Sequence, residues 1–112
     1  MSFPRLTRQL VLEAPERLPD GSGGYSESWV PLGTVFAEVQ GRTGRETRGP
    51  AVPLSTARYS ITLRAAPWGT EARPRPGQRF REGDRLFPIE AVVEADADAR
   101  FITCHCEEEV VA

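Results

Sequence analysis

Short stretches in which apolar and polar residues alternate dominate this chain, and turns rich in Gly and Pro separate them. Successive side chains of a β-strand point to opposite faces, so such alternation is typical of a sheet with one buried face. The clearest stretch is Arg58–Arg64, where Tyr59, Ile61 and Leu63 alternate with polar residues. No segment keeps apolar residues at helical spacing for three turns, so we expect little helix.

The whole pattern predicts five to seven short antiparallel strands. The predicted segments are about Leu6–Ala14, Tyr25–Val30, Thr34–Gln40, Arg58–Arg64, Arg79–Arg81, Arg85–Glu94 and Arg100–Val110. The residues expected on buried faces are Leu10, Leu12, Val35, Ala37, Val39, Tyr59, Ile61, Leu63, Phe87, Ile89, Ala91 and Val93.

Gly and Pro suggest where these strands are interrupted. We expect Pro15 to end the first strand, and Pro31–Gly33 to form a turn between the second and the third. Glu82-Gly83-Asp84 predicts a tight hairpin turn. Pro88 cannot donate to a sheet ladder, so it indicates a sheet edge or a bulge.

The fold class that follows is all-β, and the strand number and turn spacing point to a small single-domain β-barrel or sandwich, of which we favour the barrel. A chain of 112 residues is long enough for one domain, residues 1–112, and not for two. Closure into a barrel removes the unpaired edges that would otherwise invite aggregation.

One long loop interrupts the pattern, at about residues 41–57. It is rich in Gly and Pro and carries the charged residues Arg42, Arg45, Glu46 and Arg48. Loops of this length are commonly functional or disordered. The residues alone leave open whether this loop is a functional element or an inert surface excursion.

The charge composition limits the partners of the domain. All 14 basic residues are Arg, against 16 acidic ones, for a net charge of −2. Codon preference in a GC-rich genome explains the lack of Lys most simply. The near-neutral balance argues against a free-standing nucleic-acid-binding protein, which usually has a basic excess. The sequence contains no apolar run long enough to span a bilayer and no signal-peptide profile, so we expect synthesis in the cytoplasm and no membrane partner.

Candidate chemistry is sparse, and we expect neither an enzyme nor a cofactor. His105 lies between Cys104 and Cys106, and on a strand it would point away from both thiols. A zinc site or a Cys–His dyad therefore fits poorly, and two buried thiols beside a surface imidazole fit better. The acidic run Glu107–Glu109 is typical of a solvated face, although it could also dock on a basic partner.

Arg79-Phe80-Arg81 mixes basic and aromatic residues, which leaves one nucleic-acid hypothesis open. An OB-like barrel that binds single strands uses such residues for stacking and phosphate contacts. On a strand, however, the two Arg residues face away from Phe80, so a buried ring beneath a charged surface is favoured.

The order of several short motifs resembles the phage head–tail joining proteins, the head-completion or stopper proteins of phage necks and gene transfer agents. The resemblance begins at Asp20–Trp29, similar to the family's D-G-x-G-G-Y-x-E-x-W. It continues through Val35–Val39, Gly44-Arg45-Glu46, Tyr59–Arg64, Phe80–Ile89 and Cys106-Glu107-Glu108, nearly the whole chain. Pro88 and the Pro-rich Ala72–Pro76 depart from the family pattern.

This resemblance implies a structural β-barrel that forms a homo-oligomeric ring, of six or twelve copies, in the neck of a virion or phage-like particle assembled in the bacterial cytoplasm. The partners would be a portal or adaptor ring above, a tail terminator or tail tube below, and double-stranded DNA that passes without sequence specificity. The long loop would project into the DNA channel with Arg42, Arg45, Glu46 and Arg48. Candidate docking residues are Trp29, Arg64, Glu107 and Glu108.

Three alternatives stay open. The chain could be an adaptor or a tail terminator of the same neck, or an OB-like barrel that binds single-stranded nucleic acid. A Cys/His metalloenzyme would require zinc bound through Cys104 and Cys106.

Overall fold

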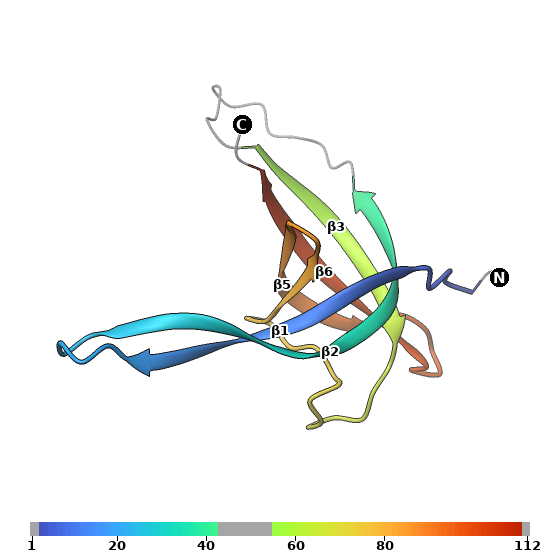
Figure 1. Cartoon of the computed structure of the whole chain (residues 1–112). Helices are drawn as coiled ribbons and strands as arrows, with labels where there is room; N and C mark the ends of the chain where they lie inside the picture. The colour runs from blue at the N-terminus through green and yellow to red at the C-terminus, as the bar shows by residue number, and fades with distance from the viewer. Residues whose placement is uncertain (1–2, 43–54, 111–112) are drawn as a thin grey trace.

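Six antiparallel strands form a closed barrel (Figure 1). The computed structural model describes residues 3–42 and 55–110. The strands are β1 (Arg8–Pro19), β2 (Tyr25–Arg42), β3 (Ser55–Arg64), β4 (Arg79–Glu82), β5 (Arg85–Glu94) and β6 (Phe101–Val110). They follow the spatial order β1-β2-β3-β6-β5-β4, and β4 pairs with β1 to close the barrel. The predicted all-β barrel is confirmed.

The inward-facing side chains of all six strands form one apolar core. Tyr59 packs edge-on against Phe87, with the two ring centroids 5.3 Å apart. The buried core residues are Leu10, Leu12, Ala37, Ile61, Leu63, Phe80, Phe87, Ile89, Ile102, Cys104 and Cys106. Most of the side chains that the alternation pattern assigned to buried faces are therefore in this core or packed against it.

The predicted hairpin at Glu82-Gly83-Asp84 is also confirmed. Glu82 pairs with Arg85, which leaves Gly83 and Asp84 as a two-residue turn between β4 and β5. Gly83 has a φ of +62°, a left-handed conformation that residues with a side chain adopt rarely.

The predicted breaks at Pro15 and at Pro31–Gly33 are wrong, because β1 and β2 both run through them. Beyond Glu13, β1 pairs with β2 alone, and proline is tolerated on such an edge. Gly33 pairs with Leu12 and Pro31 pairs with Glu13, so Leu32 is one extra residue on β2. The segment that was expected to turn is therefore a β-bulge inside one continuous strand.

The predicted inward face of β5 is correct for Phe87 and Ile89 and wrong for Ala91 and Val93. A register shift between Ile89 and Ala91 reverses the alternation, so Val92 packs against the core and Val93 is exposed. The bulge follows Pro88 closely, as one reading of that proline predicted. The alternative reading, a sheet edge, is wrong because β5 has β4 on one side and β6 on the other.

The outer parts of β1 and β2 leave the barrel as a two-stranded ribbon, which we call the arm (residues 15–29; left in Figure 1). At its tip, the Asp20 carboxylate accepts hydrogen bonds from the backbone N–H groups of Ser22 and Gly24, at 2.8 and 3.1 Å. No helix follows this glycine-rich loop, so it is a hairpin loop, as expected, and not a phosphate-binding loop.

The connection between β3 and β4, residues 65–78, leaves the barrel at the end opposite the end of β2, and its first residue, Ala65, packs against the core. Arg73 is buried there, donates a hydrogen bond to the carbonyl of Ala66 at 2.8 Å, and lies 3.8 Å from the Trp68 ring centroid.

The described part of the chain contains no helix long and apolar enough to cross a membrane.

The core makes a direct prediction about stability. Phe80→Ala should lower the free energy of unfolding by ~3–5 kcal/mol, because it removes a fully buried ring and leaves a cavity. Phe36→Ala removes the same ring from a position that is 55% exposed, and should change it by less than about 1 kcal/mol. Urea denaturation followed by circular dichroism measures both; equal losses in the two variants would contradict the assigned core.

Candidate functional site

At the end of the barrel where β2 ends and β3 begins, four inward-facing positions carry charged side chains. We call this cluster the mouth network: Arg8, Glu82, Arg85 and Glu108, with the hydroxyl of Tyr59. Each charged residue lies two positions beyond a buried core residue, so the alternation of its strand points it inward. The sequence reasoning placed only Glu108 among candidate residues. The signal that could have identified the other three is that the alternation of inward-facing residues continues past the apolar core positions to these charged residues.

The mouth network is held by paired hydrogen bonds between guanidinium and carboxylate groups. Arg8 donates from Nε and Nη2 to the two oxygens of Glu82, at 2.7 and 2.6 Å. Arg85 donates to both oxygens of Glu108, at 3.0 and 3.1 Å, and to the Tyr59 hydroxyl at 3.1 Å. A 3.6 Å ion pair between Arg85 and Glu82 joins the two halves. The network therefore links β1, β3, β4, β5 and β6.

The hydrogen bonds between opposite charges in this network shift the pKa values of Glu82 and Arg85. The hydrogen bond from Arg8 lowers the pKa of the Glu82 carboxyl, and the hydrogen bond to Glu108 raises the pKa of Arg85. With the core beneath it, the network fills this end of the barrel with side chains. Within residues 3–42 and 55–110, side chains thus fill the interior of the barrel, as is usual for barrels with few strands.

A second ionic cluster fixes the base of the arm. Glu13 is only 5% exposed and accepts hydrogen bonds from Arg79 at 2.8 Å and Arg81 at 2.7 Å. Burial acts to raise the pKa of Glu13, but the hydrogen bonds from the two guanidinium groups bring it below its ordinary value. The Arg79 guanidinium also stacks 4.0 Å from the Trp29 ring centroid. Since Phe80 is fully buried between the two arginines, the favoured reading of Arg79-Phe80-Arg81 is confirmed.

The structure describes one of the four predicted channel-loop residues. Arg42 is exposed at the end of β2, where it donates to the Ser60 hydroxyl at 3.1 Å and lies 3.5 Å from Nδ1 of His105. Arg45, Glu46 and Arg48 lie outside the described residues. Arg42 pairs with Arg58 across β2 and β3, so the connection between these strands starts and ends at the mouth of the barrel.

The four predicted docking residues do not gather on one surface. Trp29 is at the base of the arm, and Arg64 is exposed at the far end of β3, 5.5 Å from the Phe101 ring centroid. Glu107 forms a 3.6 Å ion pair with Arg58 on the outside of the barrel. Glu108 is buried in the mouth network, where both of its oxygens bind Arg85.

The two cysteine side chains lie in the core of the barrel. Cys104 and Cys106 are both buried and free, with His105 on the opposite face of β6. Burial raises the pKa of both thiols, that of Cys106 to about 12. Within residues 3–42 and 55–110, no three His, Cys, Asp or Glu side chains gather as metal ligands would.

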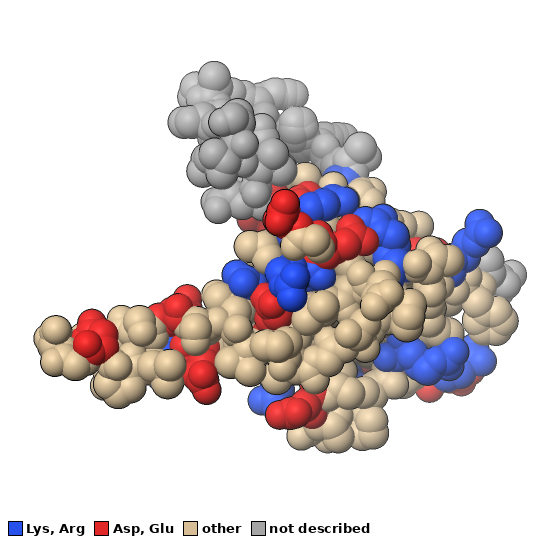
Figure 2. All heavy atoms as spheres, viewed as in Figure 1, with Lys and Arg blue, Asp and Glu red and all other residues tan. Residues whose placement is uncertain are grey.

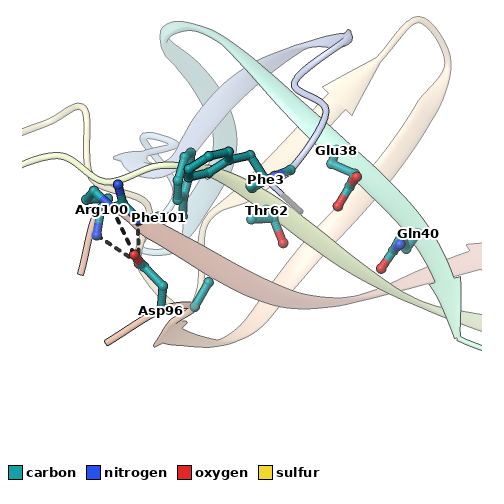
Figure 3. A pocket seen from close by; sticks show the side chains of 9 residues that line it. Phe3, Glu38, Gln40, Thr62, Asp96, Arg100 and Phe101 are labelled. Carbon is teal, nitrogen blue, oxygen red and sulfur yellow. Dashed lines mark hydrogen bonds and ion pairs between the residues drawn. The ribbon is translucent and has the colours of Figure 1, made fainter. Parts of the chain in front are cut away.

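A shallow pocket of about 350 Å³ lies between the N-terminal segment and the outer face of the barrel (Figure 3). Phe3 packs against Phe101 on one side of it, with ring centroids 6.3 Å apart. Asp96 accepts hydrogen bonds from the backbone N–H groups of Arg100 and Phe101, at 2.8 and 3.1 Å, and from the Arg100 side chain at 3.2 Å. Its carboxylate is thus committed to the turn between β5 and β6. The sequence reasoning missed this pocket, because nothing local links Phe3 to Phe101.

The cluster around Glu13 predicts how stability depends on pH. Because folding lowers the pKa of Glu13 from 4.5, its contribution is complete above pH 4.5 and is lost as the pH falls through the folded value. Glu13→Gln should therefore cost ~1–3 kcal/mol at pH 7 and progressively less below pH 4.5. Thermal unfolding at several pH values measures this, with Glu90→Gln on the exposed surface as the control. A cost that does not change with pH would argue against the assigned ion pairs.

Thiol chemistry tests the assignment of the cysteines. Because both thiols are buried, neither should react with Ellman's reagent in the folded protein within minutes, and both should react in urea. Rapid reaction of either thiol before unfolding, or stoichiometric zinc in the purified protein, would contradict this assignment.

Comparison with solved structures gives two informative matches. One chain of the virion of a native gene transfer agent particle is 48% identical, with a TM-score of 0.84, and the match covers 98% of this chain and 100% of that one. Protein SF1141 from Shigella flexneri 2a is 19% identical, with a TM-score of 0.67 and 96% of each chain covered, and shares the fold. Among curated protein sequences, none matches this chain significantly.

The family comparison covers almost the whole sequence. The model of the phage head completion proteins matches residues 1–109. The motif order, the six-stranded barrel and the gene transfer agent relative agree with this match. The chain therefore belongs to the phage head completion protein family.

Proposed function

We propose that this chain is a structural component of the neck of a phage-like particle, where it forms a ring beneath the portal or its adaptor and provides a docking surface for the tail. The observation that carries the proposal is the 48% identity, over nearly all of both chains, to a chain of a gene transfer agent virion. The proposed role involves no catalytic step and no cofactor.

The closed barrel supports a channel between copies rather than through one copy. The mouth network occupies one end, and apolar side chains from all six strands fill the interior behind it. DNA that passes this protein must therefore pass outside each barrel. A ring of barrels around a central axis satisfies that requirement.

The connection between β2 and β3 is the proposed channel element. Arg42 stands at its start on the mouth, and Arg45 and Arg48 follow in the sequence. Guanidinium groups bind phosphates in bidentate fashion without reading base sequence, which suits contact with DNA in transit. Glu46 would supply a carboxylate for an arginine of the neighbouring copy.

Replacement of residues 43–54 tests this element. A four-residue Gly/Ser linker still joins β2 to β3, so particles should assemble a neck but lose packaged DNA. Nuclease-protected DNA per particle, measured against the amount of this protein in purified particles, gives the result. A Gly/Ser segment of twelve residues is the matched control, because it keeps the length and removes the charges. Full DNA retention with the short linker would refute the channel role.

The OB-like alternative has its own measurement. The ring of Phe80 is buried and both flanking arginines bind Glu13, so this site offers no stacking platform for a base. The isolated protein should show no micromolar binding to a labelled single-stranded oligonucleotide at physiological salt. Salt-sensitive micromolar binding in fluorescence anisotropy would count against a purely structural role.

A further inference from the structure

The arm is exposed on both of its faces. Every residue of Pro15–Pro19 and Tyr25–Ser28 is exposed, including two large apolar side chains, Leu18 at 46% and Tyr25 at 64%. A two-stranded ribbon without a third strand or a packed face is only marginally stable in water. The arm therefore lacks the covering layer that a ribbon of this length normally has.

The charges on the arm are mostly negative. The arm carries three acidic residues, Glu16, Asp20 and Glu27, and one basic residue, Arg17. The Arg17 guanidinium lies 4.9 Å from the Tyr25 ring centroid. Within the described residues, Glu16 and Glu27 form no ion pair. The arm thus presents apolar side chains together with two carboxylates, Glu16 and Glu27, that form no ion pair within the described residues.

The opposite end of the molecule has complementary properties. The pocket of Figure 3 is lined by Phe3 and Phe101 and has room for an apolar side chain. Its carboxylates are occupied, since Asp96 caps the turn and Glu38 accepts the backbone N–H of Arg5 at 3.1 Å. By contrast, the guanidinium groups of Arg5 and Arg64 have no carboxylate partner in the part of the chain that the structure describes. Figure 2 shows carboxylates along the arm, and guanidinium groups over the barrel, including its right-hand end.

The placement of these two surfaces decides what kind of contact they can make. The arm tip and the N-terminal segment lie at opposite ends of the molecule, whose longest dimension is 55 Å (Figure 1). They cannot meet within one copy. They are also different surfaces, so a contact between them joins copies head to tail, and such contacts close into rings when the rotation allows.

We propose that the arm of each copy docks on the neighbouring copy, with the arm tip against the pocket formed by Phe3, Gln40 and Phe101 and with the arm carboxylates facing Arg5 and Arg64. This inference rests on the proposed function, because it names the contact that builds the proposed ring. Leu18 and Tyr25 supply the apolar part of the contact, and the ion pairs fix its direction.

Cysteine cross-linking in assembled particles tests the contact. Ser26→Cys on the arm and Gln40→Cys at the pocket are both exposed, whereas the native thiols are buried and should not react. In particles that carry both substitutions, a short bismaleimide should produce a ladder of this chain, up to a closed ring. Asp84→Cys, on the exposed turn between β4 and β5 and outside the pocket, replaces Gln40→Cys in the control and should give no ladder.

Different results of this experiment would contradict the head-to-tail contact and the proposed neck function. A cross-link from Ser26→Cys to a different neck protein, or no cross-link in particles that contain the protein, overturns the head-to-tail contact and leaves the neck role standing. Absence of this protein from purified particles overturns the neck role itself. Mass spectrometry of the cross-linked bands distinguishes these results.

Charge reversal provides a second, independent test. The double variant Glu16→Arg/Glu27→Arg and the double variant Arg5→Glu/Arg64→Glu should each reduce ring and particle yield at least tenfold. Combining all four substitutions should restore most of the yield, because opposite charges would face each other again. Thermal unfolding of each variant shows whether the fold is retained; failure of the combined variant to recover, with its fold intact, contradicts the proposed charge pairing.

Discussion

The pairing of β1 with β4, which we call the seam, closes the barrel, and the whole architecture depends on it. β1 and β4 pair through only three residues on each strand, Val11–Glu13 and Arg79–Arg81. Two ionic contacts reinforce this seam, one at Glu13 on the outside and one between Arg8 and Glu82 at the mouth. Without the seam, β1 and β4 would each have an unpaired edge, and the core would open to water on that side. Glu13 lies on β1, the strand that continues into the arm, and its carboxylate binds Arg79 and Arg81 of β4, so the same contact positions the barrel and the arm.

Much of this fold follows from the sequence, because alternation with period two is a local property of each strand. It assigned Leu10, Leu12, Ile61 and Phe87 to the buried face, and these residues are buried. The errors at Pro31–Gly33 and at Val93 have one cause. A bulge adds a residue on one strand only, and the partner strand that reveals it lies elsewhere in the sequence.

The candidate site was less accessible to sequence reasoning than the fold. The mouth network joins residues from five strands, and Arg8 and Glu82 are 74 residues apart. Exposed charges and inward charges look alike in a sequence unless the strand register is known. Motif order found the family without this geometry, and the structure then showed that Glu108, one of the motif residues, binds Arg85 inside the barrel mouth.

The filled barrel has a consequence for how an assembly of such units sets its dimensions. Each copy is a solid block, so the width of any central opening depends on the number of blocks and on the angle between neighbours. Substitutions confined to the contacts between copies could then widen or narrow the opening while every core residue stays the same. In such a ring, the width of the opening and the fold of each copy would evolve separately.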